Sequence, residues 1–208
     1  MMQSKMLVIG ITGGIGTGKT TVLDMITEHY NAYCVPADDV AKMLQTKGQY
    51  VYDRIVDHFG REVLSEDEEI NRDTLRSIVM NDQNELFWLN ELIHPEVKKY
   101  ILNDIETKRA ESDIDYYVIE AALLIQDGYK DICDVMIAVT ADREVRISRI
   151  IESRGYDREK ALSFMKNQPE STFYSENSDM ILDNSGSYEE TLTGLEKVFK
   201  NIEKNYLV

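Results

Sequence analysis

Residues 6–21 read MLVIGITGGIGTGKTT, and this stretch decides the fold of the chain. Its first part, Met6–Ile11, is a short apolar run rich in β-branched residues, which predicts a buried strand. The next part, Gly13–Thr20, matches the pattern G-x-x-x-x-G-K-[ST] in full. Apolar residues with helical spacing follow within Val22–Ile26. The sequence therefore predicts a strand, a glycine-rich loop and a helix, in the order that this motif requires.

A loop of this kind binds the phosphates of a nucleoside triphosphate. Its glycines let the backbone bend into conformations that other residues avoid, and their missing side chains leave room for phosphate oxygens. The backbone N–H groups point inward, with the positive end of the following helix behind them. We expect Lys19 to reach the β- and γ-phosphates and the hydroxyl of Thr20 to bind Mg²⁺. The predicted nucleotide-binding residues of the loop are Gly14, Ile15, Gly16, Thr17, Gly18, Lys19, Thr20 and Thr21.

Two other interpretations of the loop fit the sequence less well. In a dinucleotide-binding loop a third glycine should follow Gly14-x-Gly16, and Lys19 stands there instead. A glycine-rich turn without a ligand would not need the complete motif between a strand and a helix.

The composition is that of an ordinary globular protein with an acidic surface. The chain has 208 residues, of which 43% are hydrophobic and 29% charged, and this suits one α/β core with a helical insertion. The formal net charge of −15 disfavours a nucleic-acid partner, because such a field repels polyphosphate backbones. An anionic substrate must therefore be held by a few well-placed basic residues.

The sequence gives no sign of a membrane anchor or of a cysteine-based site. Cys34 and Cys133 are the only cysteines and lack metal-ligand spacing, so we expect reduced thiols. The apolar run before the glycines is too short for a signal peptide or a membrane span. We expect a cytoplasmic protein; the sequence does not indicate its oligomeric state.

Strands and helices alternate along the chain, which predicts an α/β fold with a parallel sheet and helices on both faces. After the first strand, strands are expected at residues 32–35, 116–120, 134–139 and 180–183, and helices at 19–30, 143–153, 157–167 and 188–205. Between Val40 and Arg109 the pattern is almost wholly helical, with Asn71 as a helix cap and Pro95 at the start of a further helix.

Three regions with separate tasks follow from this pattern. We expect residues 1–39 and 115–208 to form the nucleotide-binding core, and residues 40–114 to form a helical insertion that binds the acceptor. Within the core, residues 143–167 are expected to form a lid that closes over the phosphates.

An arginine cluster in the lid region favours a kinase. Its members are Arg143, Arg146, Arg149, Arg154 and Arg158. Planar guanidinium groups match the oxygens of a transferring phosphoryl group in pairs, and we expect Arg149 and Arg154 to act in catalysis. A regulatory GTPase would need an N-K-x-D motif late in the sheet, which the sequence lacks. The alternative is a solvated helix face whose arginines pair with Glu144, Glu152 and Glu159.

A kinase must also orient the acceptor hydroxyl, usually with a carboxylate near the γ-phosphate. Asp38, Asp39 and Glu120 are the candidates, because each lies at the end of a predicted strand on the nucleotide side. The competing interpretation is that Asp38 or Asp39 only caps the helix that includes Val40–Leu44. His94, directly before a proline, is either a structural residue at a helix start or a contact to the substrate.

The sequence resembles the dephospho-CoA kinase family over nearly the whole chain. The matching segments are Ile11–Thr21, Ala37-Asp38-x-x-Ala41, Asn71-Arg72-x-x-Leu75-Arg76, Trp88–Pro95, Ala121–Leu124, Arg149 with Arg154, Gln168, and Asp179–Gly186. They occur in the family's order and with similar spacing. The His-Pro segment together with the late Asp-Asn-x-Gly segment is far more specific than the glycine-rich loop.

The resemblance implies a P-loop kinase fold like that of nucleoside-monophosphate kinases, with a five-stranded parallel core, a helical acceptor domain and a lid. It implies transfer of the γ-phosphate of ATP, with Mg²⁺, to the ribose 3′-hydroxyl of dephospho-CoA in the last step of coenzyme A biosynthesis. The adenine would lie near Asn184 and the lid arginines. The residues expected to bind the acceptor are Asp38, Arg72, His94, Glu120 and Leu123.

Two departures from the family pattern affect these assignments. The family usually has Asp-Ala-Asp after the second strand, with the first Asp as base, but this chain has Pro36-Ala37-Asp38. We therefore expect Asp38 to be the base, with Glu120 as the second candidate. The family's Pro-Leu-Leu is Ala122-Leu123-Leu124 here, and the leucine pair is kept. The alternative functions are a kinase for another small hydroxyl or nucleoside-monophosphate acceptor, and a non-enzymatic nucleotide-binding regulator.

Overall fold

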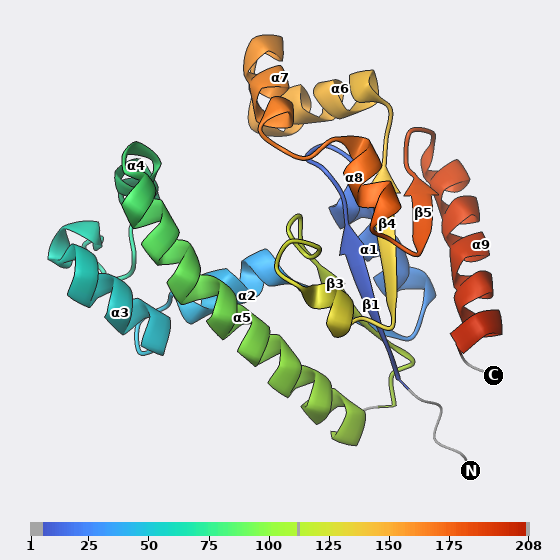
Figure 1. Ribbon diagram of the computed structural model, residues 1–208, viewed down its shortest axis with the longest axis horizontal. Coiled ribbons are helices and arrows are strands. Elements are labelled where there is room, and N and C mark those ends of the chain that lie inside the picture. The colour runs from blue at the N-terminus through green and yellow to red at the C-terminus, as the bar shows by residue number, and fades with distance from the viewer. Residues whose placement is uncertain (1–5, 112, 207–208) are drawn as a thin grey trace. The chain divides into compact units, whose positions relative to one another are not determined.

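The computed structural model describes residues 6–111 and 113–206, and the chain forms two compact units. The first unit combines Met1–Val35 with Asp113–Val208, and the second unit is Pro36–Ser112. Figure 1 labels most of the helices and strands of both units.

A five-stranded sheet is the centre of the first unit (Figure 1). Its strands are β1 (Leu7–Thr12), β2 (Ala32–Pro36), β3 (Tyr116–Glu120), β4 (Val135–Thr140) and β5 (Met180–Asp183), in the order β2-β3-β1-β4-β5. β1 runs parallel to both of its neighbours, and β5 runs parallel to β4. Every residue of β1 is buried, as expected for the central strand of a sheet covered on both faces. The predicted α/β fold with a parallel sheet is confirmed.

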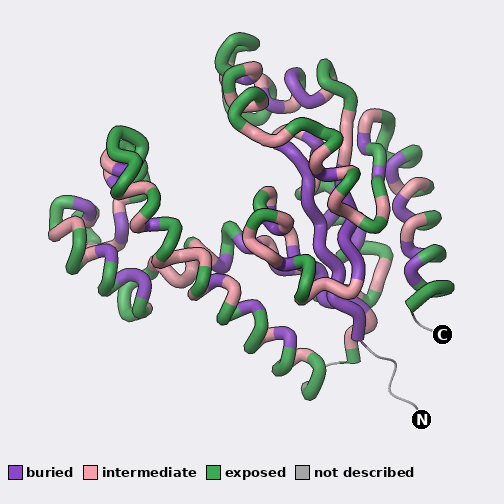
Figure 2. The backbone as a smooth tube through the Cα atoms, in the orientation of Figure 1, coloured by how far each residue is buried: buried purple, intermediate pink, exposed green. Residues whose placement is uncertain are grey.

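The helices of the first unit are α1 (Lys19–His29), α6 (Arg143–Arg154), α7 (Arg158–Lys166), α8 (Ser171–Glu176) and α9 (Tyr188–Tyr206), with a 3₁₀ turn η2 at Tyr129–Asp131. α1 and α9 share one apolar cluster with the strands, in which Met25, Ile137 and Phe199 are at most 1% exposed. Figure 2 shows the central strands β1, β3 and β4 as buried, whereas the helices are exposed on their outer sides. Burial of this apolar surface is the main source of the unit's stability.

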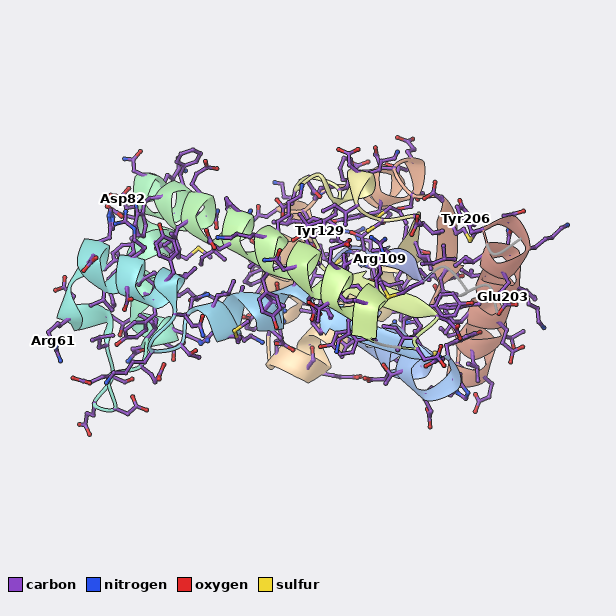
Figure 3. The ribbon with its side chains drawn as sticks, turned by 90° about the horizontal axis from the view of Figure 1, so that it is seen from below. Arg61, Asp82, Arg109, Tyr129, Glu203 and Tyr206 are labelled. Carbon is purple, nitrogen blue, oxygen red and sulfur yellow. The ribbon has the colours of Figure 1, made fainter. Side chains whose placement is uncertain are left out.

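Tyr116 connects β3 to α9 inside this core. Its hydroxyl donates a hydrogen bond of 3.4 Å to Oε1 of Glu203, which Figure 3 labels on α9. Burial, together with the negative charge of Glu203, raises the pKa of Tyr116 to about 12. The hydroxyl therefore keeps its proton, and the hydrogen bond persists, throughout the neutral pH range.

The second unit is helical. Its elements are α2 (Ala37–Leu44), α3 (Tyr50–Phe59), the 3₁₀ turn η1 (Arg61–Val63), α4 (Arg72–Asn81) and α5 (Gln83–Glu111). Val51, Ile55 and Val63 are at most 1% exposed and belong to its apolar core. Asn71 caps α4 as predicted, because its side chain accepts a hydrogen bond of 3.1 Å from the backbone N–H of Thr74. None of the helices described in either unit is long and apolar enough to cross a membrane.

The prediction that Pro95 starts a new helix is wrong, because α5 runs unbroken through Gln83–Glu111 with Pro95 inside it. A proline in a helix interior removes one backbone hydrogen bond and costs about 3 kcal/mol. Leu89, Val97 and Ile101 lie on both sides of Pro95 at helical spacing and are at most 8% exposed. Burying side chains of this size contributes roughly 1.5–3 kcal/mol each, which outweighs the cost of the proline. The apolar stripe therefore continues the helix past the proline.

Candidate active site

The phosphate-binding loop (Gly13–Thr20) joins β1 to α1. Gly18 is the N-cap of α1 and has a left-handed backbone (φ 83°), which favours glycine. A Cβ atom on Gly18 would lie 2.2 Å from Nδ2 of Asn184, so a larger residue would displace that side chain. Gly16 is restricted in the same way, because its φ is 77° and a Cβ atom there would lie 2.7 Å from the carbonyl oxygen of Arg146. The glycines therefore let neighbouring elements pack directly against the loop.

Lys19 and Glu120 lie together at the carboxyl end of the sheet. The register pairs Glu120, the last residue of β3, with Ile11, just before the loop. Nζ of Lys19 lies 3.6 Å from Oε1 of Glu120 and donates a hydrogen bond of 3.1 Å to the carbonyl oxygen of Gly13. The two side chains are only 14% and 15% exposed, so solvent screens this ion pair weakly. Leu123, three residues after β3, is 43% exposed.

A pocket of about 560 Å³ opens beside the loop and the end of α6. Its charged side chains are Lys19, Arg149, Arg154 and Glu152, so positive charge is in excess. The lining residues are Ile15, Gly16, Gly18, Lys19, Thr20, Thr21, Arg149, Ile150, Glu152, Ser153 and Arg154. A cationic pocket at the N-terminus of a helix suits a polyphosphate.

Asn184 and Arg149 hold the loop at the carbonyl oxygen of Thr17. Nδ2 of Asn184 donates to that oxygen at 2.8 Å, and Nη1 of Arg149 donates to it at 3.3 Å. Asn184 is 3% exposed, and its Oδ1 accepts a hydrogen bond of 2.8 Å from Oγ1 of Thr191 on α9. Thr191 lies outside every motif identified in the sequence, so the sequence did not indicate this hydrogen bond. Asn184 is thus a structural support of the loop, and its contact with adenine stays a prediction.

The arginine cluster has members in two different environments. Arg149 and Arg154 line the pocket, whereas Arg158 donates two hydrogen bonds of 2.8 Å to the carboxylate oxygens of Glu144. The side chains of Arg158 and Glu144 are 57% and 66% exposed, so their ion pair contributes little stability. The solvated-face interpretation is therefore correct for Arg158.

Arg146 and Gln168 hold the loop at Ile15. Nε of Arg146 donates a hydrogen bond of 2.9 Å to the carbonyl oxygen of Ile15, and Oε1 of Gln168 accepts one of 2.6 Å from its N–H. The arginine cluster in the sequence predicts that Arg146 belongs to a lid over the phosphates. In the structure its guanidinium instead donates a hydrogen bond to the backbone of the loop. The one signal for this contact is that Arg146 lies one turn before Arg149 on the same helix.

Oxygen ligands for Mg²⁺ are available beside the loop. The hydroxyl of Thr20 lies in the exposed first turn of α1. Glu120, which supplies a carboxylate, is the last residue of β3. Within residues 6–111 and 113–206, no three His, Cys, Asp or Glu side chains gather into a metal site. Mg²⁺ usually binds through one or two protein groups together with substrate phosphates, so this donor set fits the ion.

The remaining predicted acceptor residues lie in the second unit. Asp38 is exposed in the first turn of α2, and Pro36 occupies the N-cap position of that helix. The interpretation of Asp38 or Asp39 as the helix cap is therefore wrong. Arg72 is the first residue of α4. His94 lies inside α5, so it is not a helix-start residue.

Comparison with known proteins gives the same family for most of the chain. The family model for dephospho-CoA kinase matches residues 7–190. A dephospho-CoA kinase of Oceanobacillus iheyensis is 32% identical over 93% of this chain and 96% of its own. A dephospho-CoA kinase of Carboxydothermus hydrogenoformans is 34% identical over 88% of each chain.

Solved structures share the fold. A Thermus thermophilus protein aligns with a TM-score of 0.77 at 23% identity, over 95% of this chain and 98% of its own. Dephospho-CoA kinase from Campylobacter jejuni aligns with a TM-score of 0.70 at 22% identity, over 95% and 97% of the two chains. These likenesses support the fold, while the family model and the relatives above 30% identity decide the family. The chain therefore belongs to the dephospho-CoA kinase family.

Proposed function

We propose that this chain transfers the γ-phosphate of ATP to the 3′-hydroxyl of the ribose of dephospho-CoA. Its family makes it an ATP-dependent kinase of coenzyme A biosynthesis. The observation that carries the proposal is the pocket in which Lys19, Arg149 and Arg154 gather beside the phosphate-binding loop. In a chain with a net charge of −15, this local excess of positive charge suits a polyphosphate donor.

The cations of the pocket stabilise the transferring group. Lys19 is held beside the loop by Gly13 and Glu120, and its flexible stem lets Nζ move to the β- and γ-phosphates. Arg149 and Arg154 supply planar donors for the charge that spreads over the equatorial oxygens in the transition state. Removing one preorganised donor of this kind typically costs about 10²–10³ in rate.

Thr20 and Glu120 are proposed to hold the Mg²⁺ that accompanies ATP. When bound, the ion neutralises charge on the β- and γ-phosphates. The carboxylate of Glu120 thus has two partners in this proposal, the metal ion and Lys19.

Asp38 is proposed to orient the acceptor hydroxyl, with Arg72 and His94 of the same unit as further acceptor contacts. Pro36 cannot take this role because it has no carboxylate. Asp38 is exposed in the first turn of α2, where the helix N-terminus favours a negative side chain. Phosphoryl transfer has a loose transition state in which the hydroxyl loses its proton late, so one positioned carboxylate suffices.

The proposed function is tested with a panel of acceptors. ADP release from ATP and Mg²⁺ is measured with dephospho-CoA, nucleoside monophosphates and small alcohols, and the product is compared with authentic coenzyme A by mass spectrometry and ³¹P NMR. We expect dephospho-CoA to be the only acceptor in the panel that supports ADP release, and its product to carry the new phosphate on the ribose 3′-hydroxyl. Turnover only with another acceptor would make the chain a different kinase. Tight ATP binding without acceptor-dependent turnover would make it a nucleotide-binding regulator.

Replacing Arg154 with lysine should impair transfer although the charge is kept, because lysine lacks the planar fork that binds two phosphate oxygens. Arg158→Lys is the matched control, since Arg158 lies near Arg154 in sequence and pairs with Glu144 on the surface. We expect kcat with dephospho-CoA to fall in Arg154→Lys and to stay unchanged in Arg158→Lys. Equal activity of the two variants would assign Arg154 to the solvated face as well.

Replacing Asp38 with asparagine tests the orienting carboxylate, because asparagine keeps the shape but removes the charge. We expect kcat to fall by roughly 10²-fold, within the range for a positioned acid–base group, with little change in ATP affinity. Asp39→Asn is the control, because Asp39 lies in the same turn and pairs with Lys42 at 2.6 Å. An unchanged kcat in Asp38→Asn would contradict this role of Asp38, and Glu120 would then be the remaining carboxylate candidate.

A further inference from the structure

Arg146 is a buried charge without a charged partner. Its side chain is 7% exposed, and its hydrogen bonds go to neutral groups, the carbonyl oxygen of Ile15 at 2.9 Å and Oγ of Ser171 at 3.4 Å. Burial lowers the pKa of its guanidinium, and among the described residues no carboxylate forms an ion pair with it. The hydroxyl of Tyr174, a neutral neighbour, is also buried and has no hydrogen-bond partner in the part of the chain that the structure describes.

Burying an unpaired charge such as that of Arg146 destabilises the folded protein when no ligand is bound. A cation removed from water is compensated well only by an anion or by a full set of strong acceptors. In buried sites of this kind an apolar side chain of similar volume often gives an equally stable or more stable protein. The environment of Arg146 therefore indicates a negative charge that the protein itself does not supply.

The position of Arg146 shows where that negative charge would lie. A Cβ atom added to Gly14 would be 2.5 Å from Nη2 of Arg146, so the guanidinium packs directly against the backbone of the phosphate-binding loop. The guanidinium is thus in direct contact with the loop that is proposed to bind the phosphates. Because Arg146 is only 7% exposed, solvent screens its charge weakly, and the charge acts on groups bound at this loop.

The same residue fixes the shape of the loop. The carbonyl oxygen of Ile15 accepts a hydrogen bond from Arg146, and the backbone N–H of Ile15 donates one to Gln168. The side chain of Ile15 packs in an apolar cluster with Ile147 and Ile150 of α6. Main chain and side chain of Ile15 are thus both held, so the loop keeps its conformation before a ligand arrives.

We propose that Arg146 is a positioning residue for ATP, which fixes the Ile15 peptide and places a buried positive charge against the phosphate-binding loop. The inference rests on the proposed function only in that this loop binds ATP, and it does not depend on the acceptor.

The test compares Arg146→Met with Arg146→Lys and with the control Lys200→Met. Methionine removes the charge and keeps an apolar stem, while lysine keeps the charge without the fork. Lys200 on α9 is 75% exposed, so its loss changes the net charge of the protein equally, away from the site. For each variant we measure the Kd of ATP by calorimetry, the KM of each substrate, and the free energy of unfolding in urea without nucleotide.

We expect Arg146→Met to weaken ATP binding roughly 10-fold or more, because the variant loses both the positive charge beside the loop and the hydrogen bond that fixes the Ile15 peptide. The KM of dephospho-CoA should not change. The unfolding free energy should stay the same or rise, because a buried unpaired charge has been removed and water can reach Ile15 and Ser171. Arg146→Lys should be intermediate in ATP affinity, and Lys200→Met should behave as the unmodified protein.

Two results would overturn the proposal. Unchanged ATP affinity in Arg146→Met would show that the buried charge does not act on the nucleotide. Loss of stability or failure to fold would assign Arg146 to the structure alone. If the unmodified protein binds ATP but does not phosphorylate dephospho-CoA, the proposed function fails while the comparison of ATP affinities still decides the role of Arg146.

Discussion

The site depends on hydrogen bonds that hold the carbonyl oxygens of the phosphate-binding loop from outside. The oxygen of Thr17 accepts from Asn184 and Arg149, and the oxygen of Ile15 accepts from Arg146. A glycine-rich loop loses much backbone entropy when it is ordered, so external contacts must offset that cost. Because these donors bind mainly to carbonyl groups, other N–H groups of the loop can turn to the phosphates. The loop is therefore ordered by groups that do not compete with most of its ligand contacts.

Topology explains how distant segments supply these groups. The strands around β1 are parallel, so Glu120 at the end of β3 and Asn184 directly after β5 reach the edge where the loop begins. The helix α6 follows β4 and adds its arginines at the same edge. Positive charge is thus concentrated beside one loop, although the whole chain carries a net charge of −15. An acidic enzyme can bind an anionic donor in this way without attracting polyanions over its whole surface.

The sequence predicted the elements with strong local signals. The apolar runs, the glycine-rich loop and caps such as Asn71 all depend on neighbours within a few residues, and the structure has them in place. The sequence could not predict that α5 continues through Pro95. A proline locally disfavours a helix, and the apolar stripe that outweighs it is buried only in the folded unit. The contacts of Arg146 and Asn184 with the loop join residues more than a hundred positions apart, so no local pattern contains them. The roles of Asp38, Arg72 and His94 remain predictions from sequence.

The central claim is that the phosphate-binding loop is held in shape before nucleotide binds. The most direct measurement is amide hydrogen exchange at Ile15, followed by NMR in the nucleotide-free protein and in Gln168→Leu. The N–H of Ile15 donates to Oε1 of Gln168 at 2.6 Å, so this amide should exchange slowly and lose its protection in the variant. Exchange of Ile15 as fast as that of an unprotected amide in the nucleotide-free protein would contradict the account, because the loop would then be ordered only by its ligand.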